Sequence, residues 1–246
     1  MRILVVNVNT NQSMTEGIVR SAQRAASPNT EVVGLTPRFG AESCEGNFES
    51  YLAAVGVIDA VMSFNGEFDA VVQAGYGEHG REGLQELLDV PVVDITEAGA
   101  AAAMFLGRRY SVVTSLDRTV PLIEDRLLLA GLDRHCVSIR ASGLSVLELE
   151  SDSSRAVEAI TGEASLAVKN EFAEVIVLGC GGMAGITENI ERSLEVPVVD
   201  GVAAAIKFAE SFCDLGLGTS KSRTYASPRS KRIVGWPLRG NIQSGA

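Results

Sequence analysis

The sequence predicts an α/β protein with two pseudosymmetric lobes, each a parallel sheet flanked by helices, and an active site in the cleft between the lobes. Two observations lead to this prediction. Apolar runs of strand length alternate with helical patterns along nearly the whole chain, which is typical of βαβ units. In addition, motifs of the first part of the chain recur about 105 residues later, a period too long for a solenoid.

The expected strands are short runs rich in valine, isoleucine and leucine, as buried parallel strands require. In chain order they are residues 3–7, 31–35, 70–74, 90–93, 111–114, 136–139, 175–179 and 196–199. Amphipathic or alanine-rich stretches between them predict helices. These helices are residues 13–26, 48–63, 96–106, 118–130, 154–170 and 202–213.

Polar residues at helix starts support several of these boundaries. Ser13 is followed three positions later by Glu16, the pattern of a capping box. Asp94 and Asp200 each follow a strand and precede a helix, so we interpret both as N-caps.

The internal repeat pairs the two parts of the chain motif by motif. The aligned pairs are DAVVQAGYG (69–77) with EVIVLGCGG (174–182), VPVVD (90–94) with VPVVD (196–200), and RILVVN (2–7) with RYSVVT (109–114). The repeat predicts a first lobe of residues 1–95 plus 201–218 and a second lobe of residues 96–200. Residues 219–246 form a C-terminal tail.

The tail differs from the rest of the chain in charge. It carries no acidic residue, includes the only tryptophan, Trp236, and contains the basic residues Lys221, Arg223, Arg229, Lys231, Arg232 and Arg239. The tail is either a solvated segment or a segment that packs on an acidic body, including that of a neighbouring subunit. We expect a homo-oligomer.

Composition disfavours several classes of protein. A net charge of −10 argues against nucleic-acid binding as the main activity. No apolar run reaches the roughly 18–20 residues of a membrane helix, and the first residues do not resemble a signal peptide, so we expect a cytoplasmic protein without membrane contact. Four scattered cysteines and two histidines give no common zinc spacing, so we expect no metal.

The loops after the strands hold the candidate site residues, because ligands of open α/β sheets bind at the carboxyl ends of the strands. These loops contain small hydroxyl and amide side chains, glycines and one thiol. The candidates are Asn9, Thr10, Gly75, Tyr76, His79, Thr114, Ser115, Cys180, Gly181 and Gly182.

Cys180 and His79 are the candidate catalytic residues. Cys180 ends a strand and precedes Gly181 and Gly182, so backbone N–H groups are expected near its sulfur and would lower the thiol pKa toward neutrality. A purely structural cysteine is the alternative. His79 follows a strand, and it either transfers a proton or hydrogen-bonds its loop.

The other cysteines and one glycine motif carry less information. Cys136 and Cys213 fall in apolar patterns and are read as core, while Cys44 lies in an irregular acidic stretch. Residues 75–80 match GxGxxG, but this is not the first βα turn, and no clear acidic residue follows about 20 positions later. Nucleotide binding is therefore disfavoured, and no cofactor is expected.

Taken together, these motifs resemble the aspartate/glutamate/hydantoin racemase superfamily, and within it the hydantoin and allantoin racemases. The resemblance covers nearly the whole chain up to the tail, including residues 2–16, 69–80, 91–97, 112–114, 177–200 and 218–225. It implies a cofactor-independent enzyme that exchanges a proton next to a carbonyl. One cysteine from each lobe would face the substrate carbon, and the second-lobe cysteine matches Cys180. Asn9, Thr114 and the amides of Gly181 and Gly182 would contact the substrate.

The chain departs from this pattern at the first-lobe cysteine, whose position is occupied by Gly75. Three hypotheses follow. Another group, His79, Tyr76 or Glu78, replaces the missing thiol in a hydantoin-type racemase. Alternatively, Cys180 works alone as in arylmalonate decarboxylases, or in a tautomerase, isomerase, lyase or hydrolase. In the third hypothesis the chain binds a small molecule without catalysis.

Overall fold

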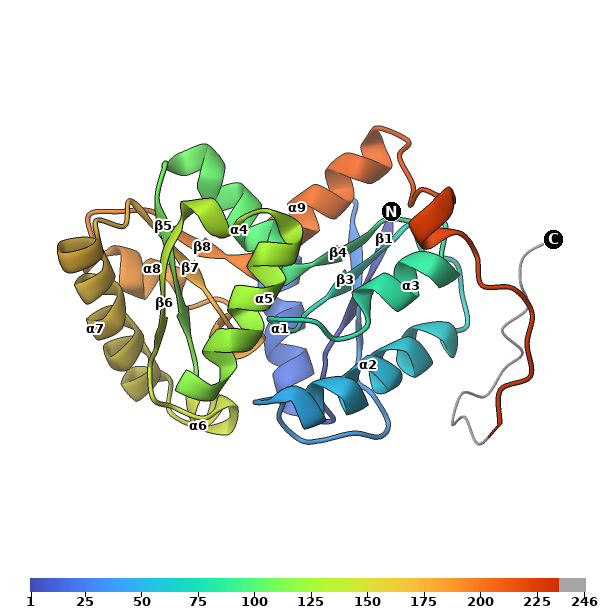
Figure 1. Ribbon diagram of the computed structural model, residues 1–246, viewed down its shortest axis with the longest axis horizontal. Helices are drawn as coiled ribbons and strands as arrows, with labels where there is room; N and C mark the ends of the chain where they lie inside the picture. The colour runs from blue at the N-terminus through green and yellow to red at the C-terminus, as the bar shows by residue number, and fades with distance from the viewer. Residues whose placement is uncertain (235–246) are drawn as a thin grey trace.

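Two separate four-stranded parallel sheets form the protein in a computed structural model, which describes residues 1–234 and all their side chains except those of residues 188 and 189 (Figure 1). The first sheet has the order β2-β1-β3-β4 and the second the order β6-β5-β7-β8. The first contains β1 (Arg2–Val6), β2 (Glu31–Leu35), β3 (Ala70–Gln73) and β4 (Val92–Asp94). The second contains β5 (Tyr110–Thr114), β6 (Cys136–Ala141), β7 (Val175–Leu178) and β8 (Val198–Asp200). The same strand order in both sheets follows from the internal repeat.

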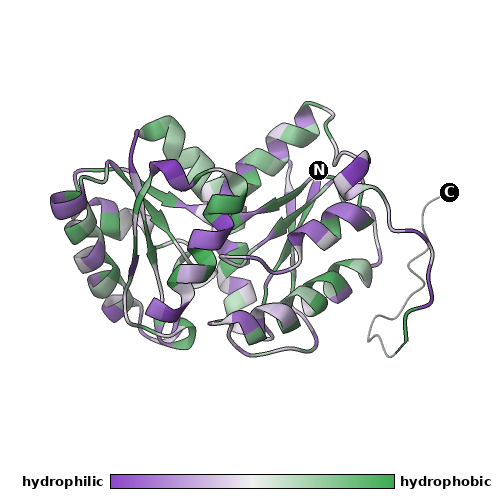
Figure 2. Cartoon of the chain, viewed as in Figure 1, coloured by the Kyte–Doolittle hydropathy of each residue, from purple (hydrophilic) through white to green (hydrophobic). Residues whose placement is uncertain are grey.

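Helices cover both faces of each sheet, so that the central strands are buried, whereas the edge strands β2 and β6 are partly exposed. The first sheet packs on α1 (Gln12–Ala25) and α9 (Gly201–Asp214) with one face and on α2 (Asn47–Met62) and α3 (Arg81–Leu87) with the other. The second sheet packs on α6 (Val146–Ser151), α7 (Ser153–Glu171) and α8 (Thr187–Glu191), and on its other face on α4 (Ile95–Leu106) and α5 (Val120–Ala130). Hydrophobic residues accordingly concentrate on the strands and on the helix faces turned toward them (Figure 2).

The predicted α/β class is confirmed, and each expected strand is present within two residues of its predicted bounds. β4 and β8 begin later than expected, after Pro91 and Pro197, which lack the N–H that a strand interior uses. The three helices that the sequence missed, α3, α6 and α8, have only five to seven residues. Such lengths are too short for a helical period to emerge from the sequence.

Helix capping agrees with the sequence at two of three expected sites. Asp94 accepts hydrogen bonds from the amides of Thr96 and Glu97, and Asp200 caps α9 in the same way. The prediction for Ser13 is wrong, because Asn11 caps α1 by accepting from the Met14 amide. A capping box does exist in the chain, but at the start of α6.

The described part of the tail begins by packing on the first sheet of its own chain. Thr219 hydrogen-bonds the backbone oxygens of Asp89 and Val90, and the Lys221 Nζ donates to the backbone oxygens of Gln85 and Glu86. Trp236 and Arg239 lie outside the described residues. Within residues 1–234, no helix is long and apolar enough to cross a membrane.

Candidate active site

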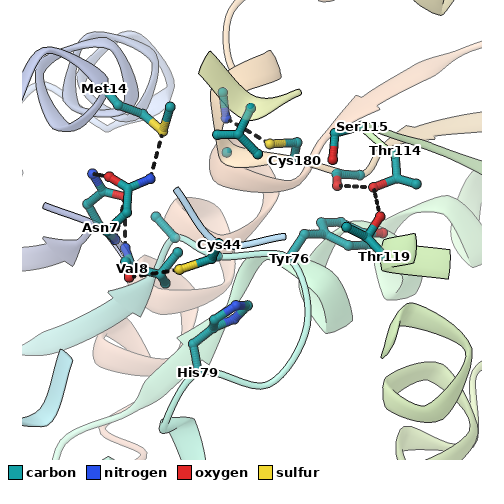
Figure 3. A pocket seen from close by; sticks show the side chains of 17 residues that line it. Asn7, Val8, Met14, Cys44, Tyr76, His79, Thr114, Ser115, Thr119 and Cys180 are labelled. Carbon is teal, nitrogen blue, oxygen red and sulfur yellow. Dashed lines mark hydrogen bonds between the residues drawn. The ribbon is translucent and has the colours of Figure 1, made fainter. Parts of the chain in front are cut away.

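A pocket lies where the loops after the central strands of both sheets meet. These strands are β1 and β3 in the first sheet and β5 and β7 in the second. The pocket is lined by Asn7, Val8, Asn9, Met14, Cys44, Ala74, Gly75, Tyr76, His79, Thr114, Ser115, Thr119, Val146, Gly179, Cys180, Gly181 and Gly182 (Figure 3). The structure thus brings together all the predicted site residues except Thr10, which instead hydrogen-bonds the Ala41 carbonyl through its amide and hydroxyl.

Cys180 stands at the carboxyl end of β7 and caps a 3₁₀ turn over Gly181–Met183, with its sulfur accepting the Gly182 N–H at 3.4 Å. The expected lowering of its pKa is wrong. Burial, together with the charge of Glu45, raises the pKa of the Cys180 thiol to about 11, although the amides of Gly182 and Met183 oppose the shift. A three-residue turn supplies too little stabilisation of the thiolate to compensate for its lost hydration, so the thiol is protonated at neutral pH.

Gly181 allows the loops of the two sheets to touch. A Cβ at this position would lie 2.6 Å from the Ala74 backbone oxygen, at the end of β3. Only a residue without a side chain permits this approach. Cys180 is thereby held directly beside the loop that carries Gly75.

Gly75 has no room for a side chain. A Cβ there would lie 2.3 Å from Val8 Cγ1 and 2.7 Å from Gln73 Nε2. The isopropyl group of Val8 therefore occupies the space that a cysteine at position 75 would need.

Cys44 is a pocket residue that the sequence analysis did not select. It lies in the segment between β2 and α2, and its sulfur donates to the Val8 backbone oxygen at 3.3 Å. Burial raises the pKa of the Cys44 thiol to about 12, with further contributions from Glu49, Cys180 and Glu45. The available sequence signal was topological, because a loop after β2 lies at the same sheet edge as the loops after β1 and β3.

His79 faces the pocket as a neutral imidazole. It is 4 % exposed, and burial lowers its pKa to about 4. Its Nε2 lies 3.5 Å from the Ser50 hydroxyl, whereas Nδ1 has no hydrogen-bond partner among the described residues. The Tyr76 hydroxyl is also buried without such a partner. These two polar atoms are available to a bound molecule.

The remaining polar groups of the pocket are held in fixed orientations. Asn7 Nδ2 donates to Asn9 Oδ1 at 2.8 Å, and Asn9 Nδ2 donates to the Met14 sulfur at 3.2 Å. On the opposite side, Thr114 Oγ1 donates to the Gly179 backbone oxygen at 3.1 Å and lies 3.1 Å from Thr119 Oγ1. A ligand would therefore meet preoriented donors and acceptors.

A second, wider pocket adjoins the first and shares Cys44, Tyr76, His79 and Thr119 with it. At its rim Arg126, which is 3 % exposed on α5, contacts Glu78, Glu82 and Asp94 of the first sheet's elements and Glu97 of α4. Among them Asp94 Oδ2 lies 3.0 Å from Arg126 Nη2. Only Arg126 and Asp94 of this ion cluster are buried, and the cluster ties the two halves of the molecule together beside the pocket.

The arrangement of the pocket residues suits proton transfer. Two thiols and one neutral imidazole line a space surrounded by hydroxyl, amide and backbone donors. Within residues 1–234, no group of three or more histidine, cysteine or acidic side chains is arranged to hold a metal ion.

Comparison with known proteins identifies a family and several close relatives. Residues 3–209 match the model of the Asp/Glu/hydantoin racemase family. A structure of allantoin racemase from Pseudomonas fluorescens is 68 % identical, with a TM-score of 0.94, over 96 % of this chain and all of that one. A structure of allantoin racemase from Klebsiella pneumoniae is 39 % identical, with a TM-score of 0.92, over 97 % of this chain and 98 % of that one. A hydantoin racemase from Pseudomonas sp. strain NS671 is 40 % identical over 96 % of this chain and 95 % of its own length.

Proposed function

Because the chain belongs to the Asp/Glu/hydantoin racemase family, we propose that it inverts the stereocentre of a small cyclic ureide of the hydantoin or allantoin class, without a cofactor. The names of its relatives support this substrate class. The observation that carries the proposal is the convergence of Cys180 and polar groups from both sheets on one small pocket. The alternating carbonyl and N–H groups of a ureide ring can form hydrogen bonds with the hydroxyl, amide and backbone groups that line the pocket.

The reaction needs a base that removes the proton from the carbon next to the ring carbonyl, and an acid that returns a proton to the opposite face. Cys180, as thiolate, is the group on the wall formed by the second sheet. The Gly182 N–H already points at its sulfur and stabilises that thiolate. The Gly181 amide supports the enolate oxygen that develops when the proton leaves.

His79 and the polar side chains position the ring. The Nδ1 atom of His79 accepts a ureide N–H, because no protein donor occupies it. Asn9, Thr114, Ser115 and Tyr76 contribute further hydrogen bonds. Gly75 contributes only its backbone to the pocket, next to Val8. Thr10 acts indirectly, because its hydrogen bond to the Ala41 carbonyl holds that segment against the loop after β1.

Proton NMR in D₂O with single enantiomers of allantoin and of a 5-substituted hydantoin, together with chiral analysis, tests this proposal. We expect deuterium at the stereocentre together with inversion. Exchange with full retention of configuration would instead support a one-cysteine enzyme. No exchange with either compound would contradict the proposed reaction. The one-cysteine and non-catalytic hypotheses are not favoured by relatives that are named racemases.

We further propose a division into two lobes, a cytoplasmic location, a homo-oligomeric state and a reaction without a metal. Residues 1–95 plus 201–218 form one lobe and residues 96–200 the other, since α9 packs on β3 and β4 of the first sheet. The protein is a cytoplasmic homo-oligomer, and it uses no metal. Size-exclusion chromatography with light scattering measures the subunit number, and a monomer across micromolar concentrations would contradict the oligomer.

A further inference from the structure

Two thiols line one pocket from opposite halves of the molecule. Cys180 follows β7 of the second sheet, and Cys44 precedes α2, beside Val8 of the first (Figure 3). We propose that Cys44 is the second acid–base group of this enzyme, a thiol supplied by the loop after β2 because position 75 cannot hold one. This inference rests on the proposed racemase function.

The packing at Gly75 explains why the thiol comes from elsewhere in the chain. Val8 fills the space next to Gly75, and the backbone oxygen of the same Val8 accepts the Cys44 S–H. The Thr10 contacts with the Ala41 carbonyl hold the segment that carries Cys44 over this wall. Residues 8–10 therefore both fill the space that a cysteine side chain at position 75 would need and hold Cys44 in the pocket.

The hydrogen bonds of the two sulfurs have opposite polarity. Cys44 donates to a carbonyl oxygen, an arrangement that keeps its proton in place. Cys180 accepts from a backbone N–H, an arrangement that favours its thiolate. The two groups also interact electrostatically, since a charge on Cys180 raises the pKa of Cys44. Of the two thiols Cys180 thus loses its proton more readily, so Cys180 is the base and Cys44 the acid.

The step balances as a proton relay across the substrate carbon. The Cys180 thiolate forms an S–H bond with the substrate proton, and the C–H electron pair moves to the carbonyl oxygen as an enolate. The enolate carbon then takes the proton of Cys44 on its opposite face, and the S–H electron pair stays on Cys44 as thiolate. The opposite enantiomer reacts from this second state with the roles exchanged.

His79 is less suited to this role than Cys44. Burial and, less strongly, the nearby Arg126 charge lower the pKa of His79 and disfavour an imidazolium, although the Gly77 backbone and Asp94 partly offset them. A base at His79 would become a buried cation after each transfer. The partnerless Nδ1 of His79 and hydroxyl of Tyr76 instead indicate that a polar ligand fills the space next to the two thiols.

Half-reactions of cysteine variants test the proposal. We would compare Cys44→Ser and Cys44→Ala with Cys213→Ser, a control on α9 outside the pocket, and measure inversion and deuterium uptake from each enantiomer. Loss of one acid–base group should lower the racemisation rate at least 100-fold in both Cys44 variants. One enantiomer should still exchange its proton with retention, because Cys180 remains. The control should behave like the wild type.

Racemisation by Cys44→Ala within about threefold of the wild-type rate would overturn the proposal while leaving the racemase function intact. Inactivity of the wild-type protein itself would instead remove the function on which the proposal rests. Should the Cys44 variants fail to fold, alkylation of the wild type by iodoacetamide gives a second measurement. Saturating ureide should protect Cys44 and Cys180 but not Cys213, and Cys44 alkylation at an unchanged rate would overturn the proposal.

Discussion

The two walls of the pocket are built on the same strand order but carry different chemistry. In the internal alignment Val8 corresponds to Ser115 and Gly75 to Cys180. In the first sheet the bulky Val8 follows β1, and Gly75, which has no side chain, follows β3. In the second sheet the small Ser115 follows β5, and the reactive Cys180 follows β7. The comparison teaches that the repeated fold fixes where side chains point, whereas local packing decides which of them can be a thiol.

The largest effect on activity is expected for a substitution of Cys180, on the pocket wall formed by the second sheet. Cys180→Ala should lower kcat/KM for a ureide by at least about 10³-fold, because no other group in the described pocket occupies its place. Steady-state kinetics by circular dichroism measures this effect, with thermal unfolding to confirm the fold. Retained activity of Cys180→Ala would contradict the role of Cys180 as the base.

The pH dependence sharpens the assignment of the base. The pKa of Cys180 is raised to about 11. At pH values below this pKa, the fraction of Cys180 present as thiolate increases tenfold for each unit by which the pH rises. We expect kcat/KM to rise about tenfold per pH unit between pH 6 and 9. A plateau beginning near pH 7 would mean that the active thiolate is stabilised far more strongly than burial allows.

The equivalent helix caps Asp94 and Asp200 offer a stability test of the same comparison. Both cap a helix, but Asp94 also faces Arg126 and Arg81, whereas Asp200 accepts from the Ser21 hydroxyl and the Gly185 amide. Asp94→Asn should reduce the free energy of unfolding by about 1.5–3 kcal/mol, since it weakens hydrogen bonds to a charged group. Asp200→Asn should cost less, about 1 kcal/mol, because asparagine keeps the oxygen that caps the helix and no ion pair is lost, although its amide nitrogen no longer accepts from Gly185. Urea unfolding of both variants measures the difference, and equal losses would contradict it.

Placing a cysteine at position 75 tests whether Val8 prevents a thiol on the wall formed by the first sheet. Gly75→Cys alone should destabilise the protein by about 1–3 kcal/mol and add no activity, because its Cβ meets Val8. Adding Val8→Ala should make the loss smaller than the sum of the two single variants. In a Cys44→Ser background, the paired change should restore racemisation. An active and stable Gly75→Cys single variant would show that Val8 does not close this position.

The fold could be predicted well because its signals are local or repeated. Runs of β-branched residues located the strands, and the recurrence of VPVVD separated the two sheets. The site loops followed from the rule that parallel strands end at one edge. Cys44 escaped notice because contacts of Thr10 and Val8, more than 30 residues away in sequence, place it in the pocket. The pKa of Cys180 was misjudged because its burial depends on both halves of the molecule at once.

The position of α9 has a consequence for biosynthesis. Val202, Ala205 and Ile206 of this helix belong to the same hydrophobic core as Ile3 and Val5 of the first strand, so the core that contains the first strand is completed only by nearly the last helix. The second sheet, in contrast, is complete at Asp200. Because chains emerge from the ribosome with the N-terminus first, the half that is translated first is the half whose core closes last. A nascent chain therefore exposes the apolar face of β3 and β4 that α9 covers until almost the whole chain has been synthesised, and this face is where chaperones would be needed.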